Sequence, residues 1–197
     1  MKRKGIVNRK TAETDIALEL CLDGQGVYQI QTPVPFLDHM LSLFAKHGFF
    51  DLTITASGDT HIDYHHTVED IGICLGKAFQ EALGDKSGIQ RYGDASVPMT
   101  DALASVTVDC SGRAHLVFQA DFPASSVGNM DVELFEEFFR AFSQNAGLDL
   151  HIGLQYGSNI HHSIEAIFKA FARACDRATQ KESRQSGIQS TKGSLDP

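Results

Sequence analysis

The chain has 197 residues and a net charge of −8, from 17 Lys and Arg against 25 Asp and Glu. This acidic balance argues against a general electrostatic attraction to nucleic acid or to an anionic membrane. No stretch approaches the roughly 20 apolar residues that a membrane-spanning helix needs, and polar residues follow the basic start, where a signal peptide would have an apolar core. We therefore expect a cytoplasmic protein of one domain, or of two small domains if the chain repeats internally.

The cysteines agree with that compartment. Four of them stand singly in apolar surroundings, with no CxxC pair and no dense spacing. This usage is typical of buried thiols in a reducing cytosol and not of a disulfide framework. They are Cys21, Cys74, Cys110 and Cys175.

The first half of the chain alternates between strand and helix patterns. Residues 16–22 and 27–31 alternate apolar and polar side chains on either side of Asp23-Gly24-Gln25-Gly26, which predicts a β-hairpin. The expected elements that follow are a helix at 36–48, a strand at 51–56 and a helix that begins at His65.

The second half repeats this order. His65-His66-Thr67-Val68-Glu69 recurs 96 residues later as His161-His162-Ser163-Ile164-Glu165, and each copy opens a helical pattern. The elements expected before the second copy are a hairpin of 104–110 with 114–120 around Ser111-Gly112-Arg113, a helix at 135–147 and a strand at 149–154. We predict an α+β protein of two similar half-domains from an internal duplication, each a small antiparallel sheet backed by two helices. The expected boundaries are 1–90, 91–180 and, for a polar tail whose composition is typical of disorder, 181–197.

The repeated HHxxE pattern points to metal binding. Residues four apart share a helix face, so His65 lies with Glu69, while His66 turns about 100° away. A single copy is more often the start of a surface helix, but two copies in matched contexts favour two metal sites that share ligands between the halves. Imidazole and carboxylate ligands without thiolates suit Mn²⁺, Fe²⁺, Zn²⁺, Co²⁺ or Ni²⁺.

Other polar residues extend these sites. His39 follows Asp38, a pairing that can orient an imidazole, and the matching position in the second half holds Glu137, so the two sites need not be identical. His151, on the strand before the second HHxxE, is a weaker ligand candidate. Isolated cations and hydroxyls in an acidic chain can together bind a phosphate, although each alone is more often a solvated surface residue. These are Arg91, Arg113, Lys169 and the Ser190-Thr191-Lys192-Gly193 segment.

Several motifs run the length of the chain in a characteristic order. They are Arg9-Lys10-Thr11-Ala12-Glu13-Thr14, Phe36-Leu37-Asp38-His39-Met40, Asp63-Tyr64-His65-His66-Thr67-Val68-Glu69-Asp70, Gly88-Ile89-Gln90-Arg91-Tyr92-Gly93, Asp109-Cys110-Ser111-Gly112-Arg113, His161-His162-Ser163-Ile164-Glu165-Ala166-Ile167-Phe168-Lys169-Ala170 and Ser190-Thr191-Lys192-Gly193. Together they resemble the imidazoleglycerol-phosphate dehydratase family of histidine biosynthesis. The resemblance implies a monofunctional lyase that removes water from D-erythro-imidazole-glycerol phosphate to give imidazole acetol phosphate. It also implies a homo-oligomer of 24 subunits built from trimers, with active sites between subunits and two Mn²⁺ ions in each.

The resemblance assigns roles to residues. Glu13 is the expected acid–base residue, with Glu165 as the alternative. The implied metal ligands are His39, His65, His66, Glu69, Glu137, His161, His162 and Glu165. The implied substrate-binding residues are Glu13, Arg91, Arg113, Lys169, Ser190, Thr191 and Lys192, so we expect the tail to be ordered when ligand binds, against its composition. The chain departs from the family at Glu137, where many members have His, at Thr100, where an acidic residue is usual, and at Gln189, where proline is usual.

The implied reaction explains the need for metal. The C–H bond to be broken is not next to a carbonyl, so no enolate can form. Metal ions that flank the substrate's imidazole would instead hold it as an imidazolate, which expels the neighbouring hydroxyl to give a diazafulvene before a base removes the proton. The alternatives are a dinuclear metal hydrolase and a non-catalytic metal-binding shell.

Overall fold

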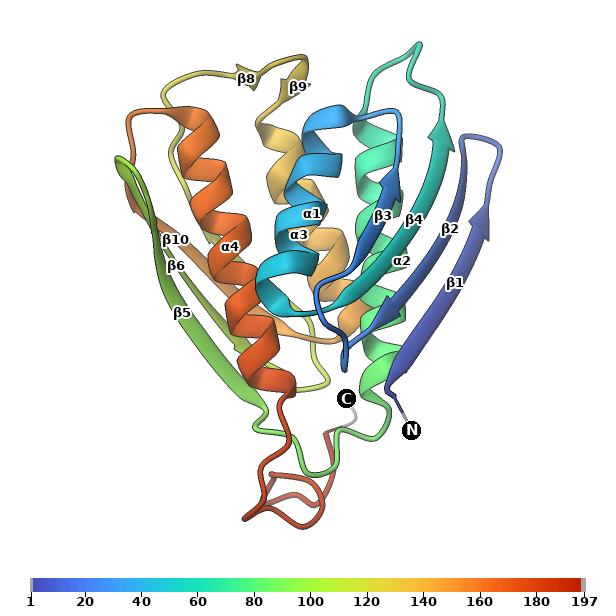
Figure 1. The fold of residues 1–197 in the computed structure, drawn as a ribbon, viewed down its shortest axis with the longest axis vertical. Helices are drawn as coiled ribbons and strands as arrows, with labels where there is room; N and C mark the ends of the chain where they lie inside the picture. Colours follow the sequence, from blue (N-terminus) through green and yellow to red (C-terminus); the bar gives the residue numbers. More distant parts are fainter. Residues whose placement is uncertain (1, 196–197) are drawn as a thin grey trace.

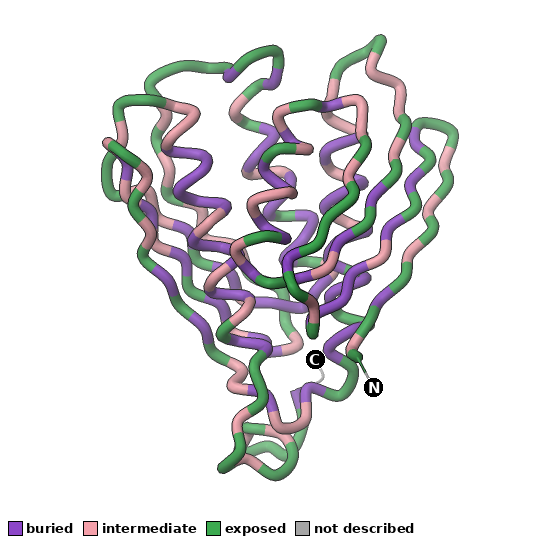
Figure 2. The backbone as a smooth tube through the Cα atoms, viewed as in Figure 1, coloured by how far each residue is buried: buried purple, intermediate pink, exposed green. Residues whose placement is uncertain are grey.

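The computed structural model describes residues 2–195; Met1 of the first expected repeat and Asp196 and Pro197 of the tail lie outside the described residues. Two four-stranded sheets form the outer layers, and four helices lie between them (Figure 1). Along the strands, buried and exposed residues alternate, so that one face of each sheet covers the helices and the other faces outward (Figure 2).

The first half contains the first sheet and two helices. Its elements are β1 (Lys4–Lys10), β2 (Thr14–Cys21), β3 (Tyr28–Gln31), α1 (Pro35–Gly48), β4 (Asp51–Gly58) and α2 (His65–Leu83). The strand order is β1-β2-β4-β3, with antiparallel pairing except between β3 and β4, which run parallel.

The second half has the same topology. Its elements are β5 (Tyr92–Met99), β6 (Ala102–Asp109), β7 (His115–Gln119), α3 (Glu133–Ala146), β10 (Asp149–Tyr156) and α4 (Ile160–Thr179), with a small hairpin of β8 (Ser126–Val127) and β9 (Met130–Asp131) before α3. The strand order β5-β6-β10-β7 repeats the first sheet, including one parallel pair. The predicted α+β fold of two similar halves is confirmed.

Both predicted hairpins are wrong, and the sheets are mixed and not purely antiparallel. Strands β2 and β3 do not pair with one another, because β4 returns from α1 and inserts between them. In the same way β10 inserts between β6 and β7. The true hairpins are β1–β2 and β5–β6. Their first strands escaped sequence analysis because each lies at a sheet edge and mixes polar residues into its pattern.

Helix and sheet approach one another equally closely in the two halves. A Cβ atom on Gly5 would lie 1.9 Å from the carbonyl oxygen of Ala78, and one on Gly93 would lie 2.0 Å from that of Ala174. No larger residue fits there without a backbone shift. One hydrophobic core, rich in phenylalanine, spans both halves. The boundaries at residues 90 and 180 stay a prediction.

The described part of the tail is folded against the body of the protein. Gly88 N donates to Gly187 O at 2.8 Å, Ile89 and Lys181 form a β-bridge, and Leu195 is buried. The disorder that composition favours is therefore not observed over these residues. All four cysteines are buried and free, as predicted. None of the helices among residues 2–195 is long and apolar enough to cross a membrane.

Candidate active site

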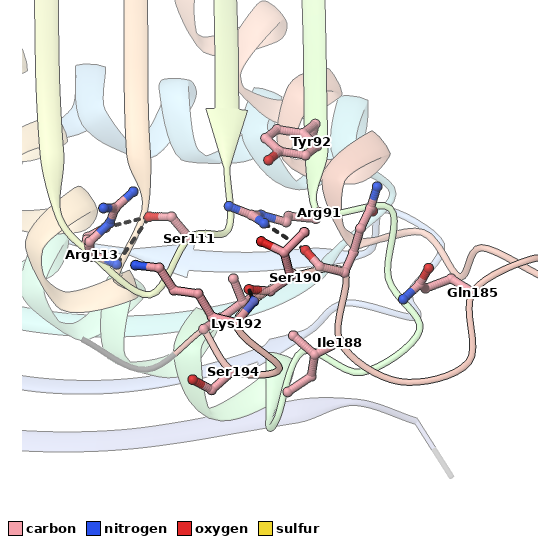
Figure 3. Close-up of a pocket in the computed structure, with 12 residues that line it drawn as sticks. Arg91, Tyr92, Ser111, Arg113, Gln185, Ile188, Ser190, Lys192 and Ser194 are labelled. Carbon is pink, nitrogen blue, oxygen red and sulfur yellow. Dashed lines mark hydrogen bonds between the residues drawn. The ribbon is translucent and has the colours of Figure 1, made fainter.

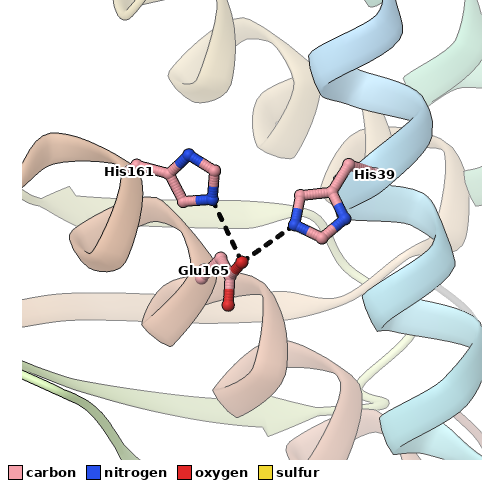
Figure 4. A group of neighbouring side chains, drawn as sticks. All are labelled: His39, His161 and Glu165. Carbon is pink, nitrogen blue, oxygen red and sulfur yellow. Dashed lines mark hydrogen bonds and ion pairs between the residues drawn. The ribbon is translucent and has the colours of Figure 1, made fainter.

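Helices α1 and α4 bring together His39, His161, Glu165 and Lys169, which we call the α1–α4 cluster. His39 Nε2 lies 2.8 Å and His161 Nε2 lies 3.1 Å from Glu165 Oε1. Lys169 Nζ donates to the other carboxylate oxygen at 2.6 Å. Figure 4 shows the two imidazoles pointing toward one carboxylate from two helices. The cluster thus brings one candidate ligand from the first half together with two from the second.

The positions of the α4 residues follow from helix geometry. His161, Glu165 and Lys169 are spaced by four residues and therefore share one face. The helix begins at Ile160, and its N-cap Asn159 accepts a hydrogen bond from His162 N at 3.2 Å. The two histidines consequently lie in the first turn, at an open end of the helix.

Glu165 is ionised at neutral pH. Burial raises the pKa of this carboxyl, but hydrogen bonds from Lys169, His39 and His161 outweigh burial and lower its pKa to about 2. The candidate ligand atoms of Glu165, His39 and His161 all lie within 4.8 Å of one another. Two imidazoles and one carboxylate are a donor set that fits a divalent transition-metal ion.

A second group lies at the start of α2 and consists of Glu13, Asp59 and His66. Asp59 Oδ2 lies 2.9 Å from His66 Nδ1, and Glu13 Oε1 lies 3.9 Å from His66 Nε2. The hydrogen bond from His66 lowers the pKa of Asp59, and the same bond raises the pKa of His66. Because Asp59 engages Nδ1, Nε2 remains the nitrogen that can bind a ligand.

In the second half, Asp101 orients His162, the counterpart of His66, in a similar way. Asp101 Oδ1 lies 2.6 Å from His162 Nδ1. Its other oxygen accepts hydrogen bonds from Ser158 N, Ser158 Oγ and Asn159 N at 2.9, 2.6 and 2.8 Å. Hydrogen bonds from Ser158 and His162 hold the pKa of Asp101 far below its usual range. Sequence analysis missed both Asp59 and Asp101, because nothing local in the sequence links Asp101 to a histidine 61 residues away.

Several predicted ligands stay apart within one chain. Helix α2 packs against α3, and α4 packs against α1, so the two HHxxE segments lie on opposite sides of the helical layer (Figure 1). Within residues 2–195, His65 and Glu69 join neither group of candidate ligands. Glu137 lies 3.6 Å from Arg140 instead. Within a single chain the two HHxxE segments therefore lie apart, and the sharing of ligands between them stays a prediction.

The remaining candidate ligand, His151, is also separate. It is exposed on β10, where its ring centroid lies 6.2 Å from that of His115. Two histidines without a carboxylate do not make a metal site of the predicted kind. His151 therefore has no place in either group.

Five of the predicted phosphate-binding residues line an open cavity of about 640 Å³ between the second half and the tail (Figure 3). The residues that line it include Arg91, Arg113, Ser190, Thr191 and Lys192. Asp109 binds Arg91 through Nε and Nη2 at 2.7 and 2.9 Å, which fixes the guanidinium, and Arg91 Nη1 donates to Gln189 O at 2.7 Å. Arg113 is 66% exposed, and its Nη2 lies 3.9 Å from Asp149 Oδ2, a long ion pair that an anion in the cavity can displace. The folded tail thus closes one side of a cationic cavity.

Lys169 is the exception among the predicted phosphate ligands. Its ammonium group is held by Glu165 and lies 3.1 Å from Met99 Sδ. It does not line the cavity formed by the other five residues in this chain. Helix spacing explains the difference, because Lys169 follows Glu165 by one turn and must share its face.

Comparisons with known proteins agree with the resemblance. A family model described as Imidazoleglycerol-phosphate dehydratase matches residues 32–175. Imidazoleglycerol-phosphate dehydratases of Trichlorobacter lovleyi and Geobacter sulfurreducens are 58% and 57% identical over 195 residues, which covers 99% of this chain and 100% of each relative. The crystal structure of the Staphylococcus aureus dehydratase matches with a TM-score of 0.83 and 44% identity, over 91% of this chain and 99% of that chain.

A more distant solved structure supports the same conclusion. The dehydratase from Pyrococcus furiosus, in complex with (S)-C348, matches with a TM-score of 0.83 and 36% identity, over 95% of this chain and 99% of that chain. The family match covers most of the chain, and the relatives match from end to end. This chain is an enzyme of the hydro-lyase class and belongs to the imidazoleglycerol-phosphate dehydratase family of histidine biosynthesis.

Proposed function

We propose that the protein converts D-erythro-imidazole-glycerol phosphate to imidazole acetol phosphate and water, in the cytoplasm. The observation that carries this proposal is the convergence of His39, His161 and Glu165, which offers a preformed set of metal ligands on a chain of this family. The cavity around Arg91, Arg113 and Lys192 supplies cations for the phosphate group of the substrate.

The metal we propose is Mn²⁺, with two ions in each active site. Imidazole and carboxylate ligands suit Mn²⁺, and bound ions would stabilise the substrate's imidazole ring in its deprotonated form. The residues proposed to hold them are His39, His65, His66, Glu69, Glu137, His161, His162 and Glu165. Because the two HHxxE segments lie apart in one chain, a site that uses both needs a neighbouring copy. We therefore also propose active sites between subunits, in a 24-subunit assembly built from trimers.

The chain's own side chains would divide the work as follows. Glu13 is exposed at a turn beside His66, where its carboxylate can accept and return a proton of bound substrate. Arg91, fixed by Asp109, and the exposed Arg113 would bind the phosphate together with Ser190, Thr191 and Lys192. Lys169 keeps Glu165 oriented and ionised and would contact substrate from the α1–α4 cluster. We retain residues 1–90, 91–180 and 181–197 as the two repeats and the tail that supplies phosphate ligands.

The test is a product assay with the Mn²⁺-loaded protein. We expect the ketone to form from imidazole-glycerol phosphate without release of inorganic phosphate. The matched control is p-nitrophenyl phosphate, which a dinuclear hydrolase would cleave and a dehydratase would not. Phosphate release from either compound would favour a hydrolase, and bound metal without any product would favour a non-catalytic shell.

A further inference from the structure

The turn that carries Glu13 is fixed by its own threonines. Residues 11–13 connect β1 to β2, and Thr11 Oγ1 accepts hydrogen bonds from Glu13 N at 3.1 Å and from Thr14 N at 3.0 Å. Thr11 N donates to Thr14 O at 2.9 Å. These bonds define the shape of the turn, but they do not attach it to the rest of the molecule.

A buried carboxylate beneath the turn makes that attachment. The side chain of Asp70 is only 7% exposed and belongs to α2. Its Oδ1 accepts a hydrogen bond from Arg9 Nη2 at 2.8 Å, and its Oδ2 accepts one from the Thr14 hydroxyl. Arg9 is the last but one residue of β1, before the turn, and Thr14 begins β2 directly after the turn. The one carboxylate thus holds both sides of the turn.

The same helix carries the histidine that faces Glu13. Asp70 follows His66 by four residues, so the two lie on one face of α2. His66 Nε2 is 3.9 Å from Glu13 Oε1. Asp70 therefore relates the position of the turn to that of His66 through a short, buried path.

The second half shows that a hairpin of this shape does not need such a network. Arg9 pairs with Ile16 as Val97 pairs with Ala104, and Thr14 begins β2 as Ala102 begins β6, so Val97 and Ala102 occupy the matching positions of the second hairpin. Ala166 follows His162 as Asp70 follows His66. Ala102 and Ala166 are buried, and Val97 packs against the core. Apolar contacts replace the network at these three positions, and the turn itself is attached to the start of α4 by Asp101, which bonds Ser158, Asn159 and His162. A buried ion pair is a weak source of stability compared with apolar side chains of similar volume.

We propose that Asp70, together with Arg9 and Thr14, is a positioning group that fixes Glu13 relative to the histidines at the start of α2. The inference rests on the proposed acid–base role of Glu13. Proton transfer requires close control of distance, and a displacement of about 1 Å can reduce a rate by about 100-fold. A charged, directional network provides that control, whereas apolar contacts permit sliding.

The test removes one hydroxyl. Thr14→Val keeps the size of the side chain and the Arg9–Asp70 pair but loses the hydroxyl's bond to Asp70 and its 3.3 Å contact with Thr11 Oγ1, and Thr14→Ser restores the hydroxyl. We expect Thr14→Val to lower kcat by about 10- to 100-fold with KM within about twofold of wild type, and bound metal to be unchanged. Amide hydrogen exchange at residues 11–14 should rise by about tenfold as the turn loosens. Thr14→Ser should return both quantities to within about threefold of wild type.

A matched exchange of all three residues separates positioning from stability. The combined Arg9→Val, Thr14→Ala and Asp70→Ala variant carries the residues of the second half at these three positions, so it should fold. It should lose at least as much kcat as Thr14→Val. Wild-type kcat in Thr14→Val or in a folded triple variant would overturn the proposal, as would a Thr14→Ser variant as impaired as Thr14→Val. Glu13→Gln, measured in parallel, tests the acid–base role separately. If Glu13→Gln keeps its activity, amide hydrogen exchange at residues 11–14 decides. Faster exchange in Thr14→Val than in wild type supports the positioning role, and unchanged exchange overturns it.

Discussion

The two halves of the molecule have the same topology but differ in the contacts of the carboxylate at the hairpin turn. Glu13 precedes β2 and Asp101 precedes β6 at matching positions, and each lies beside the second histidine of its own HH pair. Asp101 is fully engaged by His162, Ser158 and Asn159. Glu13 is exposed, with no side-chain hydrogen bond of its own among the described residues. In this duplicated scaffold one carboxylate is fully hydrogen-bonded while its counterpart stays open to solvent, as the acid–base role proposed for Glu13 requires.

The largest effect should come from Glu13→Gln. Because the amide cannot take up a proton as the carboxylate does, we expect kcat to fall by about 10²- to 10⁴-fold. Metal content should not change, since Asp59 and not Glu13 orients His66. Steady-state kinetics with metal analysis of the same sample measures both. Loss of metal would make Glu13 a ligand and would remove the difference between the halves.

Asp101→Asn should produce the opposite pattern. The amide keeps the shape of the carboxylate but not its charge. It therefore binds Nδ1 of His162 less firmly, and the Nε2 atom of that imidazole is no longer held in position to bind a metal ion. We expect Mn²⁺ affinity to fall by about 10- to 100-fold, with most of kcat regained at saturating metal. Calorimetric titration of the metal-stripped variant measures the affinity. An unchanged affinity together with a large loss of kcat would show that Asp101, like Glu13, acts in the chemistry.

The cationic cavity lies between the second half and the tail. Lys192→Ala tests whether this cavity binds the phosphate group of the substrate. Removal of a charge-assisted hydrogen bond should raise KM for the phosphorylated substrate by about tenfold. Arg184→Ala is the control, because Arg184 lies on the same tail but is bound by Glu182. Equal KM values for the two variants would exclude the tail from the site.

The smallest effect concerns acid stability. The pKa of Glu165 is lowered to about 2 in the folded protein, from about 4.5 for a free carboxyl. A group with a lowered pKa stabilises the fold above its unfolded pKa, and this contribution is lost as pH falls from about 4.5 toward 2. In metal-stripped protein, the midpoint temperature of thermal unfolding should therefore fall more steeply over that pH range for wild type than for Glu165→Gln. Parallel curves for the two proteins would contradict the lowered pKa.

Much of the fold could be predicted from the sequence because the duplication repeats its signals. The HHxxE copies mark the starts of α2 and α4, and the α1–α4 cluster follows from motif positions. Strand pairing could not be predicted, since the insertion of β4 between β2 and β3 depends on how α1 packs and leaves no local pattern. The composition of the tail predicted disorder, but the described tail residues are ordered by hydrogen bonds to residues 88–91, which composition does not reveal.

The polar contacts that orient the histidines were the least accessible to sequence analysis. Asp59 and Asp101 reach His66 and His162 from loops, and single carboxylates in loops carry no periodic signal. Asp70 was visible only as one letter of a motif, although its burial and its two partners give it a definite place. Such residues become visible only when the fold brings distant segments together.

If the proposed dehydration depends on metal held by ligands from both halves, turnover must follow metal occupancy. The most direct test titrates metal-stripped protein with Mn²⁺ while bound ions and ketone formation are measured in the same samples. We expect no turnover without metal and a rise with occupancy that levels off at about two ions per active site. Full turnover in protein without bound metal would contradict the metal dependence.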